Sequence, residues 1–98
     1  MTWYLYRLIP PRADFASTMN DAERAAMGEH VAYWTGQLGA GKAIIFSPVA
    51  DPAGDWGMAV VNADSDGELE QMGKHDPAVV TGVARYDALL LPAAIVPA

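Results

Sequence analysis

The chain has 98 residues, 52% of them hydrophobic, and twelve acidic residues against six basic ones give a net charge of −6. A field of this sign repels phosphate backbones, and no run of Lys or Arg suits an anionic membrane, so neither nucleic acid nor membrane is an expected partner. Cysteine is absent, which excludes disulfides and thiolate zinc sites and fits a reducing compartment.

The length predicts a single domain over residues 1–98, because chains of this size rarely split into two cores. Three Trp, four Tyr and five Met are more apolar surface than one thin core needs, and a subunit interface or an apolar pocket would use the surplus. The N-terminal stretch lacks the features of a secretory signal, and the apolar tail is too short to span a bilayer. We therefore expect a cytoplasmic protein.

The chain opens with a predicted strand and a long loop. Thr2–Ile9 is aromatic and β-branched enough for a strand, and Pro10-Pro11 ends it. Both faces of this strand are mostly apolar, which favours a central strand covered on two sides. Arg7 is the exception and needs a partner or an exit to water. The loop Pro10–Met19 is longer than a connection requires, and such loops are functional or mobile.

The firmest predicted helix begins at Asn20, which with Glu23 has the pattern of a capping box. It runs to about Leu38, and Gly39 and Gly41 end it. Apolar residues recur along it at spacings of four, three and four, which predicts one buried stripe of Met27, Val31, Trp34 and Leu38.

A hairpin and a second, shorter helix follow. Ala43–Pro48 and Trp56–Asn62 are predicted strands, joined by turn residues at Asp51–Asp55. A second capping box at Ser65 and Glu68 opens a helix that Pro77 closes. Leu69 and Met72 are expected to point inward from this helix. Pro77–Gly82 is expected to form one helical turn, and Ala84–Pro92 is the last predicted strand.

The order β-α-β-β-α-β predicts an α+β, ferredoxin-like fold, with a four-stranded antiparallel sheet and two helices on one face. The other face of the sheet is then open and apolar. Two copies that pack there would account for the surplus of hydrophobic residues, so we expect a homodimer.

The segment Gly36–Lys42 nearly spells a phosphate-binding loop, but we reject nucleotide binding there. Ala43 replaces the hydroxyl that should hold magnesium, and the segment leaves a helix and enters a strand, whereas the motif needs the reverse order. A glycine-rich end of the helix explains it.

His30 and Asp76 are the candidate catalytic residues. His30 flanks the apolar stripe about 60° from its centre, where an imidazole at a pocket edge can exchange protons near neutral pH; a boundary histidine bonded to water or backbone is the alternative. Asp76 precedes Pro77, so a structural role as a helix N-cap is as well supported as a catalytic one. The capping role would also hold its carboxylate in a fixed orientation. His75 is expected to be a solvated residue at a helix end.

Other candidates carry weaker signals. Tyr6 and Trp34 are candidate walls of a substrate pocket, and Arg12 is a candidate contact for a substrate anion, although arginines more often form surface or interface pairs. No histidine spacing suits a metal, and no serine lies in a nucleophile elbow. No metal and no cofactor is expected.

The ordered stretches Glu29–Leu38, Gly41–Pro48, Gly57–Val61 and Asp76–Gly82 resemble those of the YciI-like (YCII-related) family. This resemblance covers about seventy residues and implies a dimeric α/β-barrel, in which two ferredoxin-like units pack sheet to sheet. It also implies a cleft with a histidine from the first helix and an aspartate before a proline, which fall on His30 and Asp76. Ser47-Pro48 departs from the Gly-Pro of many relatives.

These signals predict a small-molecule enzyme that uses His30 as general acid/base, oriented by Asp76, in an apolar cleft. The resemblance implies lyase- or isomerase-like chemistry on a small cyclic compound. The alternative is a non-catalytic dimeric module that binds a small molecule or serves a partner protein, and a third interpretation gives both residues structural roles alone.

Overall fold

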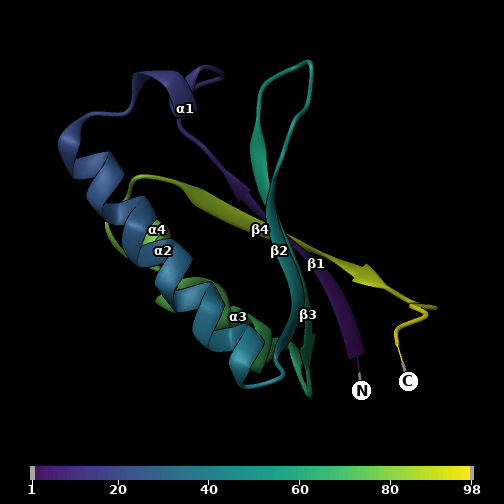
Figure 1. The fold of residues 1–98 in the computed structure, drawn as a ribbon. Coiled ribbons are helices and arrows are strands. Elements are labelled where there is room, and N and C mark those ends of the chain that lie inside the picture. Colours follow the sequence, from purple (N-terminus) through teal and green to yellow (C-terminus); the bar gives the residue numbers. More distant parts are fainter. Residues whose placement is uncertain (1, 98) are drawn as a thin grey trace.

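A four-stranded antiparallel sheet in the order β2-β3-β1-β4 carries α2, α3 and α4 on one face (Figure 1). The computed structural model describes residues 2–97. Its strands are β1 (Thr2–Ile9), β2 (Ala43–Val49), β3 (Trp56–Ala63) and β4 (Arg85–Leu91). Its helices are α1 (Phe15–Thr18), α2 (Asp21–Gly39), α3 (Asp66–His75) and α4 (Pro77–Val80). The predicted ferredoxin-like α+β fold is therefore confirmed.

β1 lies between β3 and β4, and its alternating side chains divide the molecule into two sides. Tyr4, Tyr6 and Leu8 are buried towards the helices, whereas Arg7 lies on the opposite face. There Arg7 forms two hydrogen bonds to Asp87 of β4, with Nε–Oδ1 and Nη2–Oδ2 distances of 2.7 and 2.6 Å. The expected partner of this arginine is thus its cross-strand neighbour, which the register places directly opposite.

The opposite face of the sheet, here called the open face, is not covered by any helix. Cross-strand partners share a face, so the register assigns its members. Around the Arg7–Asp87 pair it presents apolar side chains from all four strands: Trp3, Leu5, Ile9, Ile45, Val49, Met58, Val60, Leu89 and Leu91. Within a single chain, β1 is therefore covered on one side, not on the two sides that its sequence predicts.

The capping box that opens α2 is confirmed. The Asn20 side chain accepts a bond from the Glu23 backbone N–H at 2.8 Å, and the Glu23 carboxylate accepts one from the Asn20 N–H at 2.9 Å. At the other end of α2 the chain reverses at Gly41, whose φ of 76° suits glycine. None of the helices within residues 2–97 is long and apolar enough to cross a bilayer.

The predicted buried stripe of α2 is wrong in two of its four members. Val31 and Leu38 are 50% and 37% exposed, whereas His30 lies at the centre of the side that faces the sheet, between Ala26 and Trp34. The reason is that the pattern weighed apolar side chains alone. Polar side chains can also be buried when their hydrogen bonds are satisfied inside the protein. On this side of α2, His30 is such a side chain, because it bonds Asp76.

Part of the predicted loop Pro10–Met19 forms the short helix α1, and Phe15 is buried beneath it. The segment is tied to the start of α2 by Arg12, whose guanidinium donates to both oxygens of Glu23 at 2.8 and 2.9 Å and to Thr18. This arginine holds the pKa of Glu23 well below its usual range, at about 2. α1 is thereby fixed at one end of the helical layer, near the β2–β3 hairpin (Figure 1).

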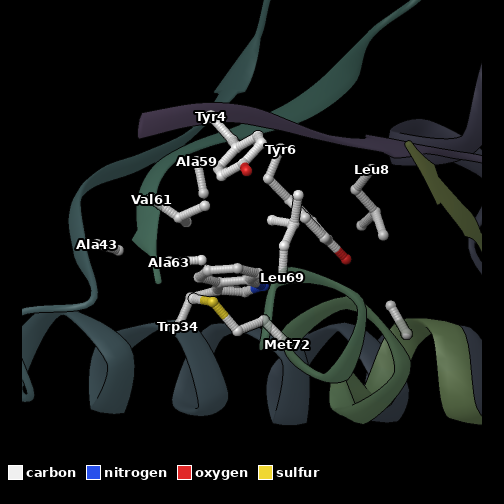
Figure 2. Packing of buried hydrophobic residues seen from close by; sticks show 11 residues of the cluster. Tyr4, Tyr6, Leu8, Trp34, Ala43, Ala59, Val61, Ala63, Leu69 and Met72 are labelled. Atoms are coloured by element: carbon white, nitrogen blue, oxygen red, sulfur yellow. The ribbon is translucent and has the colours of Figure 1, made fainter. Parts of the chain in front are cut away.

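The core fills the space between the sheet and α2 and α3. Figure 2 shows Trp34 and Met72 beneath the side chains of β1 and β3. Leu69 and Met72 are buried, as predicted. The second capping box forms only in half: the Ser65 side chain accepts from the Glu68 N–H, but the Glu68 carboxylate bonds Lys42 and the backbone of Asp64, because Lys42 offers it an opposite charge.

Candidate functional site

Asp76 is a fully buried carboxylate at the junction of α3 and α4, with 0% of its surface exposed. Its backbone N–H closes α3 by donating to the Gly73 carbonyl, and its side chain caps α4 by accepting from the Ala78 N–H at 3.0 Å. Pro77 at the first helical position needs no partner for its nitrogen. The N-cap role that the sequence predicts for Asp76 is therefore confirmed.

Three further donors converge on this carboxylate from β1 and α2. The Tyr6 hydroxyl and the Trp34 indole Nε1 each donate to Oδ2 at 2.9 Å. His30 Nδ1 lies 2.8 Å from Oδ1 and 2.9 Å from Oδ2. His30 and Trp34 are four residues apart on α2 and hence lie on one face of that helix, while Tyr6 points to the same side from the central strand.

The charge of Asp76 is set by the balance of burial against these bonds. Burial alone raises the pKa of its carboxyl, but the hydrogen bonds from His30 and Trp34, the charge of His30 and the Ala78 N–H outweigh it and leave the pKa below its usual range. Burial and the adjacent Asp76 raise the pKa of the Tyr6 hydroxyl. Asp76 is thus an ionised acceptor, and Tyr6 is a protonated donor beside it.

An ionised Asp76 determines which nitrogen of His30 carries the proton in the neutral ring. Because a carboxylate can only accept, Nδ1 must be the donor, and Nε2 then holds the free lone pair. Within residues 2–97, Nε2 makes no hydrogen bond. The His30 side chain is 13% exposed, and His30 lines a cavity. Such a nitrogen can accept a proton from a bound molecule and can return it.

The cavity has a volume of about 260 Å³ and lies between the helix-facing side of the sheet, the first half of α2 and the α1 segment. Tyr6 and Trp34 line it together with His30, so these two residues border the cavity as well as bonding Asp76. Most of the remaining wall is apolar or aromatic and includes Phe15, Met27 and Phe46. The imidazole of His30 therefore lies in largely apolar surroundings.

The structure brings four of the five predicted site residues together, namely Tyr6, His30, Trp34 and Asp76. Arg12 is not among the residues that line the cavity, and its guanidinium is occupied by Glu23 and Thr18; its role as an anion contact is a prediction that its position does not favour. His75 is exposed and lies 2.7 Å from the Gln71 carbonyl through Nδ1.

Most walls of the cavity were not predicted from the sequence, among them Phe15 and Phe46. Phe15 lies in a segment predicted to be a loop, and Phe46 lies in a strand whose facing could not be assigned, because Ile44 and Ile45 beside it are equally apolar and a register shift follows Ala43. The one available signal was that buried Tyr and Trp side chains need partners for their polar ends. That rule would have linked Tyr6 and Trp34 to a buried acceptor.

No arrangement of three or more His, Asp or Glu residues able to hold a metal ion is found within residues 2–97. The nearest acid and histidine, Asp76 and His30, already bind each other. Asp76 is also surrounded by donors, which leaves its oxygens no position for a cation.

No protein-family model matches the chain, and no curated protein matches it. Among solved structures, it is similar to 5-chloro-2-hydroxyhydroquinone dehydrochlorinase from Burkholderia phenoliruptrix AC1100 in complex with 2,5-dihydroxybenzoquinone. The two share 15% sequence identity over 91% of each chain, with a TM-score of 0.63. This likeness is one of fold alone, and membership of the YciI-like family stays a prediction.

Replacing Asp76 by Asn tests how much the fold depends on the buried carboxylate. The Asn side chain has one acceptor oxygen for four donors, so we expect a loss of roughly 1–3 kcal/mol of unfolding free energy. Because the pKa of Asp76 is lowered in the folded protein, its ionised form stabilises the protein above pH 3.8 and less as the pH falls through the folded pKa. The substitution should remove that part of the pH dependence, measured by denaturant unfolding.

The matched control is Ser65→Ala, which removes the side-chain cap of α3. It should cost about 1 kcal/mol and leave the acid dependence unchanged, since no ionisable group is lost. Equal losses with identical pH dependence in both variants would show that Asp76 acts as a cap alone.

Proposed function

We propose that this protein is a small-molecule enzyme in which His30 acts as general acid/base and Asp76 orients it. The proposal rests on one observation: the Nδ1 side of His30 is bound by a buried, ionised carboxylate while the ring lines an apolar cavity. A carboxylate in this position fixes the ring and stabilises the imidazolium that forms when Nε2 takes a proton.

The proposed chemistry is a proton transfer on a small cyclic compound, without a cofactor. His30 Nε2 takes a proton from an O–H or C–H group of the substrate, and the electrons left behind move into the ring. An isomerisation is completed when the proton returns at another position; a lyase-like elimination is completed when a leaving group departs with an electron pair. The apolar wall keeps water away from the charge that develops in between.

The structural neighbour supports this class of substrate. Its name assigns it the dehydrochlorination of a chlorinated hydroxyhydroquinone, and its complex holds 2,5-dihydroxybenzoquinone. We take from it the inference that a fold of this kind can accommodate chemistry on a hydroxylated ring, and we propose a reaction of the same general class for this chain. The acid/base role of His30 is our own inference from the contacts of the cavity.

We further propose one YciI-like domain over residues 1–98, which functions as a cytoplasmic homodimer. The open face supports the dimer, because its apolar side chains from four adjacent strands form a continuous surface around a single ion pair. Monomeric proteins rarely expose apolar patches of this kind. Two copies that pack through this face leave both cavities, on the helix side, accessible.

Substitution of His30 by Gln tests the catalytic role. In a panel of hydroxyhydroquinones that carry a halide leaving group, including 5-chloro-2-hydroxyhydroquinone, we expect one or more to be converted with release of halide, as followed by ultraviolet absorbance and mass spectrometry. His30→Gln should lower kcat by a factor of about 100 or more, the usual contribution of a general base, with little change in ligand affinity. Asp76→Asn should lower kcat less.

Two results would contradict the proposal. Wild-type turnover in His30→Gln would exclude the acid/base role. Ligand binding without conversion of any compound in the panel would favour the alternative, a non-catalytic module that holds a small molecule.

A second test concerns the dimer. Leu89→Glu places a charge on the open face, and an unpaired buried charge is costly, so the variant should sediment as a monomer at concentrations where the wild type is a dimer. Val80→Glu, an equally apolar and exposed position on α4, is the matched control and should stay dimeric. A monomeric wild type, or a dimeric Leu89→Glu protein, would contradict dimerisation through the open face.

A further inference from the structure

We propose that the cavity selects a small uncharged ring compound with a hydroxyl group, held by apolar contacts and one hydrogen bond to His30, and discriminates against carboxylates. This inference rests on the site described under the proposed function and adds the substrate's charge class. It departs from the expectation that Arg12 binds a substrate anion. Four independent features of the chain carry it.

The first feature is size. A volume of about 260 Å³ lies below the range of about 300–1,000 Å³ that drug-sized ligands occupy. The aromatic walls include Trp34 and Phe46, which suit the face or edge of a ring. A single ring with its substituents fits within this space.

The second feature is the placement of positive charge. None of the six Lys and Arg residues lines the cavity. Arg85 begins β4 on the open face, and the other five are held by carboxylates elsewhere: Arg7 by Asp87, Arg12 by Glu23, Arg24 by Asp21, Lys42 by Glu68 and Lys74 by Glu70. A bound carboxylate would thus meet no cationic side chain other than a protonated His30.

The third feature is that capping side chains occupy backbone donors at the start of α2 and of α4. Helix N-termini commonly bind anions through free N–H groups. At α2, the Asn20 side chain takes the Glu23 N–H and the Glu23 carboxylate takes the Asn20 N–H. At α4, Asp76 takes the Ala78 N–H. The donors that these caps use are not free to replace the missing cation.

The fourth feature is the charge of the His30–Asp76 pair itself. With neutral His30 the pair carries −1, and with protonated His30 it carries zero, so neither state attracts an anion overall. The exposed carboxylate of Asp55, which also lines the cavity, and the net charge of −6 act in the same direction. A carboxylate would therefore lose its hydration without an equivalent partner.

One polar contact remains for the ligand. Nε2 of neutral His30 is an acceptor, and it suits a hydroxyl hydrogen. The Ser47 hydroxyl, the other uncharged polar side chain of the wall outside the Asp76 cluster, already donates to the Pro48 carbonyl at 2.8 Å. The ligand is thus held by one directional bond and by burial of its ring.

The test compares three ring compounds of similar size and different charge: 4-hydroxybenzyl alcohol, 4-hydroxybenzoate and 4-hydroxybenzylamine. Binding to the full-length protein is measured by amide and indole NMR shifts, with the Trp34 Nε1–H signal as reporter of the cavity. We expect the neutral alcohol to bind at least about tenfold more tightly than the carboxylate. It should also bind more tightly than the amine, because an ammonium group would lose its hydration in an apolar cavity, and the carboxylate of Asp55 is exposed to solvent, where an ion pair contributes little. Equal or tighter binding of either ion, or no binding of the alcohol at millimolar concentration, would overturn the inference.

A charge inserted in the wall should reverse the selection. Val31 lines the cavity and is half exposed, so Val31→Lys can be accommodated, and it should raise affinity for 4-hydroxybenzoate about tenfold. Ala32→Lys adds the same charge at an exposed position of α2 outside the cavity and should change affinity much less. Equal effects of both variants would mean that overall charge, not the cavity wall, sets the preference. Tight binding of the alcohol without conversion would support this inference and count against the enzyme.

Discussion

The buried carboxylate of Asp76 is the constraint on which the rest of this structure depends. An isolated ionised carboxylate cannot be buried without large cost, and here it is surrounded by donors from β1, α2 and α4. Tyr6 comes from the central strand β1, His30 and Trp34 come from the long helix α2, and Ala78 comes from the short helix α4. One side chain therefore links the sheet to two helices that are distant in sequence.

The same set of bonds gives the molecule its candidate chemistry. Tyr6, Trp34 and His30 all line the cavity, but His30 also has a second ring nitrogen, Nε2, which makes no hydrogen bond within residues 2–97. The protein thus gains a fixed imidazole with a free nitrogen from contacts that also hold its core together. This dual use explains why structural and catalytic interpretations of His30 and Asp76 need not exclude each other.

The α1 segment completes the cavity without taking part in this network. Arg12 is committed to Glu23 and holds the segment against the start of α2, which places Phe15 over one end of the space. The positive charge of Arg12 is thereby used for structure. What remains is an apolar, acid-biased space, and this is the physical basis for expecting an uncharged ligand.

The fold could be predicted from sequence because its signals are local. The capping box at Asn20, the turn residues at Asp51–Asp55 and the proline after Asp76 each determine their own element. The site was predictable only in part, since it depends on contacts between residues forty to seventy positions apart. Apolar periodicity placed His30 at the edge of the buried side of α2, because it could not register that a hydrogen bond to Asp76 allows most of the imidazole to be buried.

Residues with an ambiguous environment account for the other differences. Val31 has the apolar character of a core residue, yet it borders the cavity and solvent. Arg12 has the chemistry of an anion contact, yet Glu23 lies one helical turn into α2 and takes its guanidinium. For both residues, the role depends on the neighbours that the fold places around the side chain and not on the residue type alone.

The tautomer of neutral His30 tests the central claim most directly. Long-range ¹H–¹⁵N NMR of the wild-type protein distinguishes a protonated nitrogen from a free one in the imidazole ring. An ionised Asp76 that accepts from His30 requires the proton on Nδ1 and the lone pair on Nε2. A ring protonated on Nε2, with Nδ1 free, would contradict both the orientation by Asp76 and the acid/base role drawn from it.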